Sequence, residues 1–157
     1  QEIARTAEVW VDSGVRTSDQ AIDVVVAGAF RTVLSTAYLR GESELRQAWK
    51  LSPEMAFEIA TEASVVRASS PEFSNQAPER LAAMARSIGV RDVVYSPASG
   101  PVDWRLAGDL SRGGALWVGG VFDRDDIGRL QQSGAVGGIF SIREELGLLR
   151  EGAEPTT

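Results

Sequence analysis

Glycine and hydroxyl residues gather where four of the expected strands end. Glycine lets a backbone N–H approach an anion closely, and serine or threonine adds a hydroxyl donor. These residue types favour the binding of an anionic group such as phosphate. They fall into two sets, one in each half of the chain: Ser13, Gly14, Ser35 and Thr36, then Gly119, Gly120 and Ser141.

Any acid–base chemistry in this chain must proceed without histidine or cysteine, because the sequence contains neither. Carboxylates, lysine, tyrosine and water remain as proton carriers. The weak catalytic candidates are Asp12, Glu58 and Ser96, which lie at or near expected strand ends. The lack of histidine also removes the commonest transition-metal ligand, so we expect no metal and no cofactor.

Glu58 lies in the segment 55–60, MAFEIA, where large apolar residues alternate with small or charged ones. A period of two predicts a strand, with Glu58 on the inward face beside two alanines. Burying a carboxylate on the inward face without a partner costs free energy, so Glu58 is either paired with an arginine or functional. We favour the arginine pair, or a hairpin over 61–67 that would alter the strand assignment.

The chain repeats itself at a distance of 106 residues. VWVDSGVRTSDQAIDVVVAGAFRTVLST begins at Val9, and LWVGGVFDRDDIGRLQQSGAVGGIFSI begins at Leu116. Each copy is typical of a strand, a glycine loop, a helix, a glycine and a second strand. Trp10 matches Trp117 across a one-residue gap, and we expect both rings to fill the interior of the sheet. Identical pairs are Val15/Val121, Asp19/Asp125, Gly28/Gly134, Ala29/Ala135 and Ser35/Ser141.

Six strands, mostly followed by helices, are expected along the chain. Strands joined by helices pair in parallel, and closing a barrel of this kind takes about eight of them. We therefore predict a TIM (βα) barrel that lacks its first two units, in one domain over 1–149 with a disordered tail over 150–157. The predicted strands cover 9–12, 31–36, 55–60, 90–96, 116–119 and 137–141; the helices cover 18–27, 42–51, 78–87, 103–111 and 124–133; and 69–77 is predicted to be a polar loop.

Composition excludes several classes of partner. The 157 residues carry a net charge of −6, and 43% of them are hydrophobic. A negative chain is a poor ligand for nucleic acid, whose phosphates attract basic surfaces. No apolar run approaches the roughly 20 residues that span a bilayer. We expect a cytoplasmic protein with no nucleic-acid or membrane partner.

The repeat resembles a known family. VDSGVRTSDQAIDVVVAGAFRTVLST is similar to the third-to-fourth-strand segment of the histidine-biosynthesis barrels, which are phosphoribosylformimino-5-aminoimidazole carboxamide ribotide isomerase and the related cyclase. IGVRDVVYS resembles their sixth strand, and WVGGVFDRDDIGRLQQSGAVGGIFS resembles the seventh and eighth. The similarity is closest to the uncharacterised proteins related to that isomerase. It implies a barrel of the ribulose-phosphate-binding type whose substrate carries two phosphates, one on each of the two residue sets named above.

The catalytic positions depart from that family. Its isomerase has an aspartate at the end of the fifth strand, where this chain has Ala60, and another after the sixth-strand threonine, where Pro97 follows Ser96. We expect the protein to bind a phosphorylated sugar-type metabolite without histidine-pathway isomerase activity, with an isomerase or lyase reaction left open. The alternative is a non-catalytic subunit or interaction module, whose open barrel is completed by another chain or by a second copy in a homo-oligomer.

Overall fold

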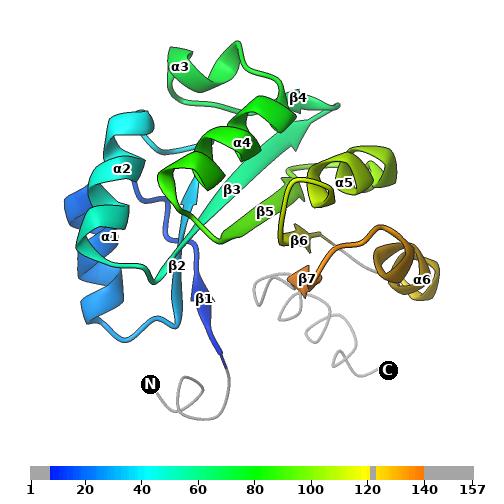
Figure 1. Cartoon of the computed structure of the whole chain (residues 1–157), viewed down its shortest axis with the longest axis horizontal. Helices are drawn as coiled ribbons and strands as arrows, with labels where there is room; N and C mark the ends of the chain where they lie inside the picture. The colour runs from blue at the N-terminus through cyan, green and yellow to red at the C-terminus, as the bar shows by residue number, and fades with distance from the viewer. Residues whose placement is uncertain (1–7, 121–122, 140–157) are drawn as a thin grey trace, which may run out of the picture.

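A computed structural model describes residues 8–120 and 123–139 (Figure 1). Its six parallel strands form one curved sheet in the order β1-β2-β3-β5-β6-β7, with a short strand β4 antiparallel to β3. This confirms the predicted parallel α/β half-barrel. Ser141 and the predicted tail over 150–157 lie outside the described residues. The strands are β1 Trp10–Val11, β2 Arg31–Ser35, β3 Met55–Glu62, β4 Val65–Val66, β5 Asp92–Pro97, β6 Leu116–Gly119 and β7 Gly137–Ile139.

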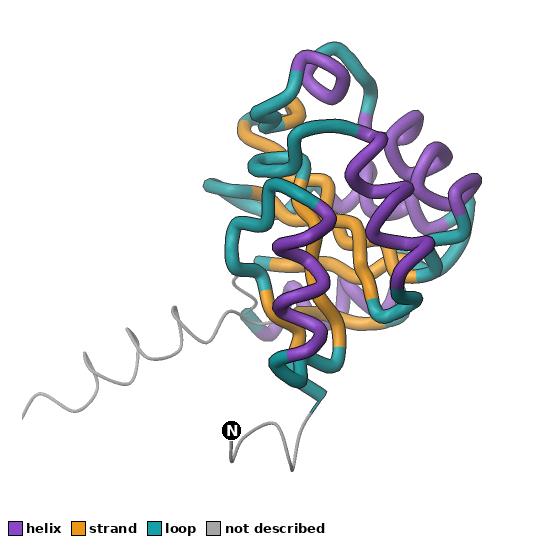
Figure 2. Tube along the Cα trace, turned by 90° about the vertical axis from the view of Figure 1, so that its left-hand side faces the viewer, coloured by secondary structure: helices purple, strands orange, loops and turns teal. Residues whose placement is uncertain are grey.

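Helices follow the strands and cover the outer face of the sheet (Figure 2). Capping residues mark where they begin: the Thr17 side chain accepts a hydrogen bond from the Gln20 N–H, and Asp103 accepts one from Leu106. Gly89 takes the left-handed conformation that ends α4, with a φ of 116°. The helices are α1 Ser18–Val26, α2 Glu42–Leu51, α3 Pro71–Ser74, α4 Pro78–Ile88, α5 Trp104–Ser111 and α6 Arg124–Gln132.

The polar loop predicted over 69–77 contains the short helix α3, so that prediction was wrong in part. Ser70 caps the helix by accepting from the Glu72 N–H, and Pro71 occupies its first turn, where a missing N–H costs nothing. Phe73 is 1% exposed and packs edge-on against Phe57, with ring centroids 6.0 Å apart. The buried ring anchors a segment whose other residues are mostly polar.

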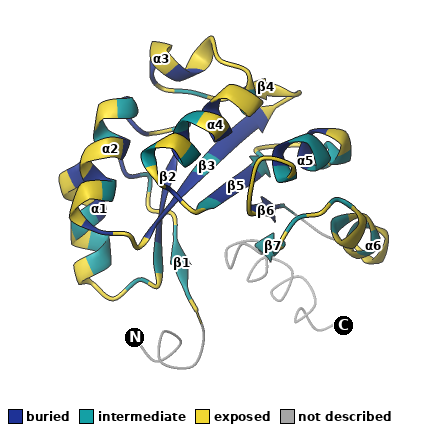
Figure 3. Ribbon diagram, viewed as in Figure 1, coloured by how far each residue is buried: buried dark blue, intermediate teal, exposed yellow. Residues whose placement is uncertain are grey.

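Strand β3 is the centre of the molecule and ends in the predicted hairpin. It pairs in parallel with β2 on one side and β5 on the other, and its residues are nearly all buried (Figure 3). Burial on both faces explains its apolar composition. Ala63 and Ser64 turn the chain into β4 with φ values of 48° and 65°. Non-glycine residues rarely adopt this conformation, so the turn is strained.

The inner face of the sheet has its own apolar cluster. The rings of Trp10 and Trp117 lie 5.0 Å apart between their centroids, although β1 and β6 are not neighbours in the sheet. They pack on Val33, Ala56 and Val94. The sheet is therefore curled far enough for distant strands to meet across its interior, and both tryptophans fill that interior as predicted.

Candidate functional site

The carboxyl ends of the parallel strands bring the candidate residues to one edge of the barrel. Asp12 follows β1, and Glu58 lies in β3, two strands away in the sheet order. Ser35, at the end of β2, pairs in register with Glu58 and hydrogen-bonds its carboxylate. Ser96, near the end of β5, pairs with Ala60, one inward position beyond Glu58. In parallel barrels this is the edge at which ligands bind.

Glu58 is an inward-facing carboxyl group without a counter-charge. Burial raises its pKa to about 7, the negative charge of Asp12 adds to the shift, and the Ser35 hydrogen bond opposes it. Within 8–120 and 123–139, no arginine or lysine lies within ion-pair distance of Glu58, so the favoured arginine pairing was wrong. The strand assignment itself holds, because the hairpin begins beyond Glu58. A carboxyl group in these surroundings can hold or release a proton near neutral pH.

Asp12 is the second carboxyl group of the site and the more exposed of the two. Loss of hydration raises its pKa, and the Gly14 N–H, 3.3 Å from Oδ1, acts in the opposite direction. The repulsion between the two groups means that Glu58 keeps its proton while Asp12 is ionised. One acid and one base therefore face the same space.

Asp92 is an inward carboxylate at the opposite end of the barrel, and its bonds indicate a structural role. Asp92, at the start of β5, receives Arg31 Nε at 3.1 Å on Oδ2 and Trp117 Nε1 at 3.1 Å on Oδ1. Both of its oxygens are satisfied, and the group closes the amino-terminal end of the interior. Glu58, one strand away, has only a hydroxyl partner and a second carboxylate. The contrast makes Glu58 the candidate functional group of the two.

The first predicted phosphate set offers few free donors. The N–H of Thr36 donates to the Glu58 carbonyl at 2.9 Å, and its hydroxyl bridges the carbonyl of Arg67 and the N–H of Ala60. The Gly14 N–H is directed to Asp12. Among the first set, Ser13 alone has an exposed hydroxyl. The sequence could not reveal this, because each of these bonds depends on the strand register.

In the second predicted phosphate set, the two described glycines pack against neighbouring side chains. Gly119 ends β6, and a Cβ built on it would lie 2.9 Å from the Ser96 hydroxyl, so the two residues are in contact. Gly120 has a φ of 141° and faces Val102 and Pro97. Ser141, the last member of this set, lies outside the described residues. Phosphate binding at either set stays a prediction.

Sequence reasoning missed Tyr38, which lies on the loop between β2 and α2 beside the first set. A Cβ built on Gly14 would lie 3.8 Å from its ring, and the side chain is 38% exposed. Its position directly after an expected strand end was the available signal. In the described part of the chain, no group of three or more histidine, cysteine or acidic residues could hold a metal ion, and no helix there is long and apolar enough to cross a membrane.

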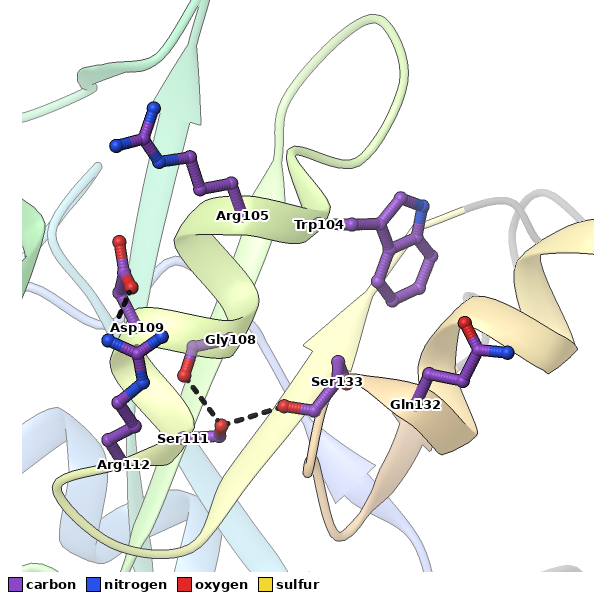
Figure 4. Close-up of a pocket in the computed structure, with 8 residues that line it drawn as sticks. All are labelled: Trp104, Arg105, Gly108, Asp109, Ser111, Arg112, Gln132 and Ser133. Atoms are coloured by element: carbon purple, nitrogen blue, oxygen red, sulfur yellow. Dashed lines mark hydrogen bonds and ion pairs between the residues drawn. The ribbon is translucent and has the colours of Figure 1, made fainter.

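A separate hollow lies on the outer wall between α5 and α6 (Figure 4). The Ser111 hydroxyl lies 2.8 Å from the carbonyl oxygens of both Gly108 and Ser133 and ties the two helices together at its floor. Trp104 and Gln132 line the same hollow. It is formed by helices alone and is not part of the strand-end site.

Comparison with known proteins supports the fold at a coarse level. No family model matches the chain, and no curated protein matches it. Among solved structures it is similar to the crystal structure of 2,3-dimethylmalate lyase, a PEP mutase/isocitrate lyase superfamily member, with a TM-score of 0.57 and 12% identity. The match covers 92% of this chain and 57% of that one, so this chain spans little more than half of that structure's length. The chain is thus a parallel α/β half-barrel of the TIM-barrel-like class.

Proposed function

We propose that the protein is a barrel enzyme that transfers protons on a small phosphorylated, sugar-type metabolite, with Glu58 as the acid and Asp12 as the base. The observation that carries this proposal is the uncompensated carboxyl group of Glu58 beside Asp12, at the edge where barrels bind ligands. Gly120, which follows β6 with a φ of 141°, and the resemblance to the histidine-biosynthesis barrels support a phosphorylated ligand.

The two carboxyl groups suit an isomerisation that needs no cofactor. Ionised Asp12 takes a C–H proton beside the substrate carbonyl, while protonated Glu58 gives its proton to the carbonyl oxygen, leaving an enediol. Asp12 then gives its proton to the former carbonyl carbon, while the second hydroxyl of the enediol gives its proton to Glu58, so the carbonyl moves by one position and both groups return to their starting states. A pair of carboxyl groups whose pKa values are pushed apart can divide acid and base roles in this way.

The proposed reaction is distinct from that of the histidine-pathway isomerase. Ala60 and Pro97 stand where that family has aspartates, and neither side chain transfers protons. Glu58 lies one inward position before Ala60 on the same strand, so the proposed acid is displaced toward the interior. Turnover of the histidine-pathway ribotide well above background would contradict this part of the proposal.

The test is proton exchange into D-ribose 5-phosphate in D₂O at pH 7, followed by the loss of the proton NMR signal beside the carbonyl. Glu58→Gln and Asp12→Asn are each expected to slow exchange by about 100-fold or more, since a positioned acid or base contributes about that much. Glu62→Gln is the matched control, because this exposed carboxylate lies at the end of the same strand. Exchange that survives in both variants, or that the unaltered protein never catalyses with phosphorylated aldoses and ketoses, would reject the proposal.

The second candidate function is an interaction module, favoured by the open sheet. Within the described residues, β1 and β7 each pair with a neighbour on one side only. Free parallel edges invite pairing with another chain or a second copy. A strictly monomeric mass by light scattering across a wide concentration range would weigh against it.

A further inference from the structure

Three arginines lie on adjoining loops of the site edge. Arg16 is in the loop between β1 and α1, Arg40 is in the loop between β2 and α2, and Arg67 follows β4; all three are exposed. The Arg40 N–H donates to the Arg16 carbonyl at 3.1 Å, and the Thr36 hydroxyl donates to the Arg67 carbonyl at 2.8 Å. One backbone hydrogen bond and one from a threonine side chain therefore join the three loops that carry the three guanidinium groups. We call these residues the arginine rim.

The guanidinium groups of the arginine rim are available for a ligand. None of them makes an ion pair with another residue in the described ranges. Nearby acidic side chains already have partners: Glu44 Oε2 accepts from the Ser18 N–H at 2.7 Å, Glu72 Oε2 accepts from the Glu42 N–H at 2.9 Å, and Glu42 pairs with Arg46. Within the described ranges, the three guanidinium groups of the rim thus carry positive charge that no carboxylate pairs with.

The rim offers a phosphate more donors than the loops closer to the carboxyl pair, where most donors are occupied. The Gly14 N–H and both polar groups of Thr36 are bound within the protein. A phosphate placed against them would also meet ionised Asp12, and like charges at close range repel. The rim, carried by the same loops, offers cations without that repulsion.

We propose that Arg16, Arg40 and Arg67 bind the phosphate group of the substrate. This inference rests on the proposed function, in which the remainder of the substrate would extend from the rim past Tyr38 to Asp12 and Glu58. Guanidinium groups bind phosphate through paired, charge-assisted hydrogen bonds, which suits several arginines around one dianion. Tyr38 is on the same loop as Arg40, and its exposed ring lies against Gly14, two residues after Asp12.

The test uses inorganic pyrophosphate as the probe and isothermal titration calorimetry at low salt. In one variant all three rim arginines become alanine, R16A/R40A/R67A. The matched control is R91A/R112A/R129A, which removes the same charge from exposed positions before β5, at the end of α5 and in the last turn of α6, away from the site edge. The rim variant is expected to lose at least tenfold in affinity, since each charge-assisted contact is worth about that factor, and the control is expected to lose about twofold or less.

Equal weakening of both variants would show non-specific attraction and overturn the proposal. Unchanged affinity in the rim variant, or no pyrophosphate binding by the unaltered protein, would overturn it as well. Circular dichroism melting of both variants checks that the fold survives, which is expected because all six arginines are exposed. Proton exchange is measured separately. If the unaltered protein binds pyrophosphate at the rim but catalyses no exchange, the proposed function alone is rejected.

Discussion

The helices of the two repeat copies have matching bounds and different surroundings. Helices α1 and α6, Ser18–Val26 and Arg124–Gln132, begin and end at residues that differ by the same 106 positions. Their caps, Thr17 and Asp123, correspond too. Yet Ala21 is fully buried in α1, whereas its counterpart Ile127 in α6 is 48% exposed. Local residue types set the helix bounds in both copies, and the neighbouring elements decide which side chains are buried.

The copies also differ in chemistry at the strand end. Counting from the matched tryptophans, Asp12 in the first copy corresponds to Gly119 in the second. The first copy therefore brings a carboxylate to the site, and the second brings a buried glycine that packs against Ser96. A pseudo-symmetric barrel need not bind a pseudo-symmetric substrate, and here the carboxyl groups lie on one side.

The largest expected effect on stability comes from comparing a buried position in α1 with the matching exposed position in α6. Ala21→Asp places a charge in the core without a partner and is expected to lower the free energy of unfolding by about 3–5 kcal/mol. Ile127→Asp changes an exposed position and is expected to cost within about 0.5 kcal/mol. Urea denaturation measures both. Similar costs for the two substitutions would mean that α6 is packed as tightly as α1.

The next effect concerns the carboxyl pair and pH. Folded Glu58 keeps its proton up to about pH 7, whereas the unfolded chain loses it near the ordinary pKa of 4.5. The unfolded state thus binds fewer protons in this window, so the contribution of Glu58 to stability is complete below pH 4.5 and is lost as pH rises to 7.

Glu58→Gln removes the loss of stability that accompanies ionisation of this group at higher pH. At pH 8 the variant is expected to be more stable than the unaltered protein by about 2–3 kcal/mol, and at pH 4 the two should be alike. Denaturation at both pH values measures the difference, with Glu62→Gln as the control. A gain in stability of the same size at both pH values would indicate an effect of packing instead of an effect of Glu58 ionisation.

The smallest effect compares the glycines that follow the two helices. Gly28 and Gly134 have φ values of 102° and 83°, so alanine at either position is expected to cost about 1 kcal/mol. Gly134→Ala should cost more, because its Cβ would lie 3.1 Å from the Ser111 hydroxyl, while Gly28 has open space. Thermal melting of the two variants measures the difference, and a larger cost at Gly28 would contradict it.

Much of the fold could be predicted because its signals are local. A period of two identified β3, and the predicted helices over 18–27, 103–111 and 124–133 agree with α1, α5 and α6 to within one residue at each end. The 106-residue repeat then indicated parallel strands in a barrel. The short helix α3 was not predicted, because the burial of its one large ring, Phe73, depends on packing against Phe57 from a distant strand.

The candidate site was harder to predict, because its chemistry depends on which side chains meet across the sheet. Arg31 pairs with Asp92, 61 residues further along the chain, and no arginine reaches Glu58 in the described part. Nothing local distinguishes these two inward carboxylates in the sequence. The occupied donors of Thr36 likewise follow from strand register.

The Trp10–Trp117 contact gives the molecule a spectroscopic marker of its own curvature. Indole rings with centroids 5.0 Å apart interact electronically when they absorb light, and here they belong to strands that are not neighbours. Their coupling depends on the curl of the sheet and is independent of helix content. Uncurling of the barrel would therefore change the near-ultraviolet spectrum even while every helix stayed intact.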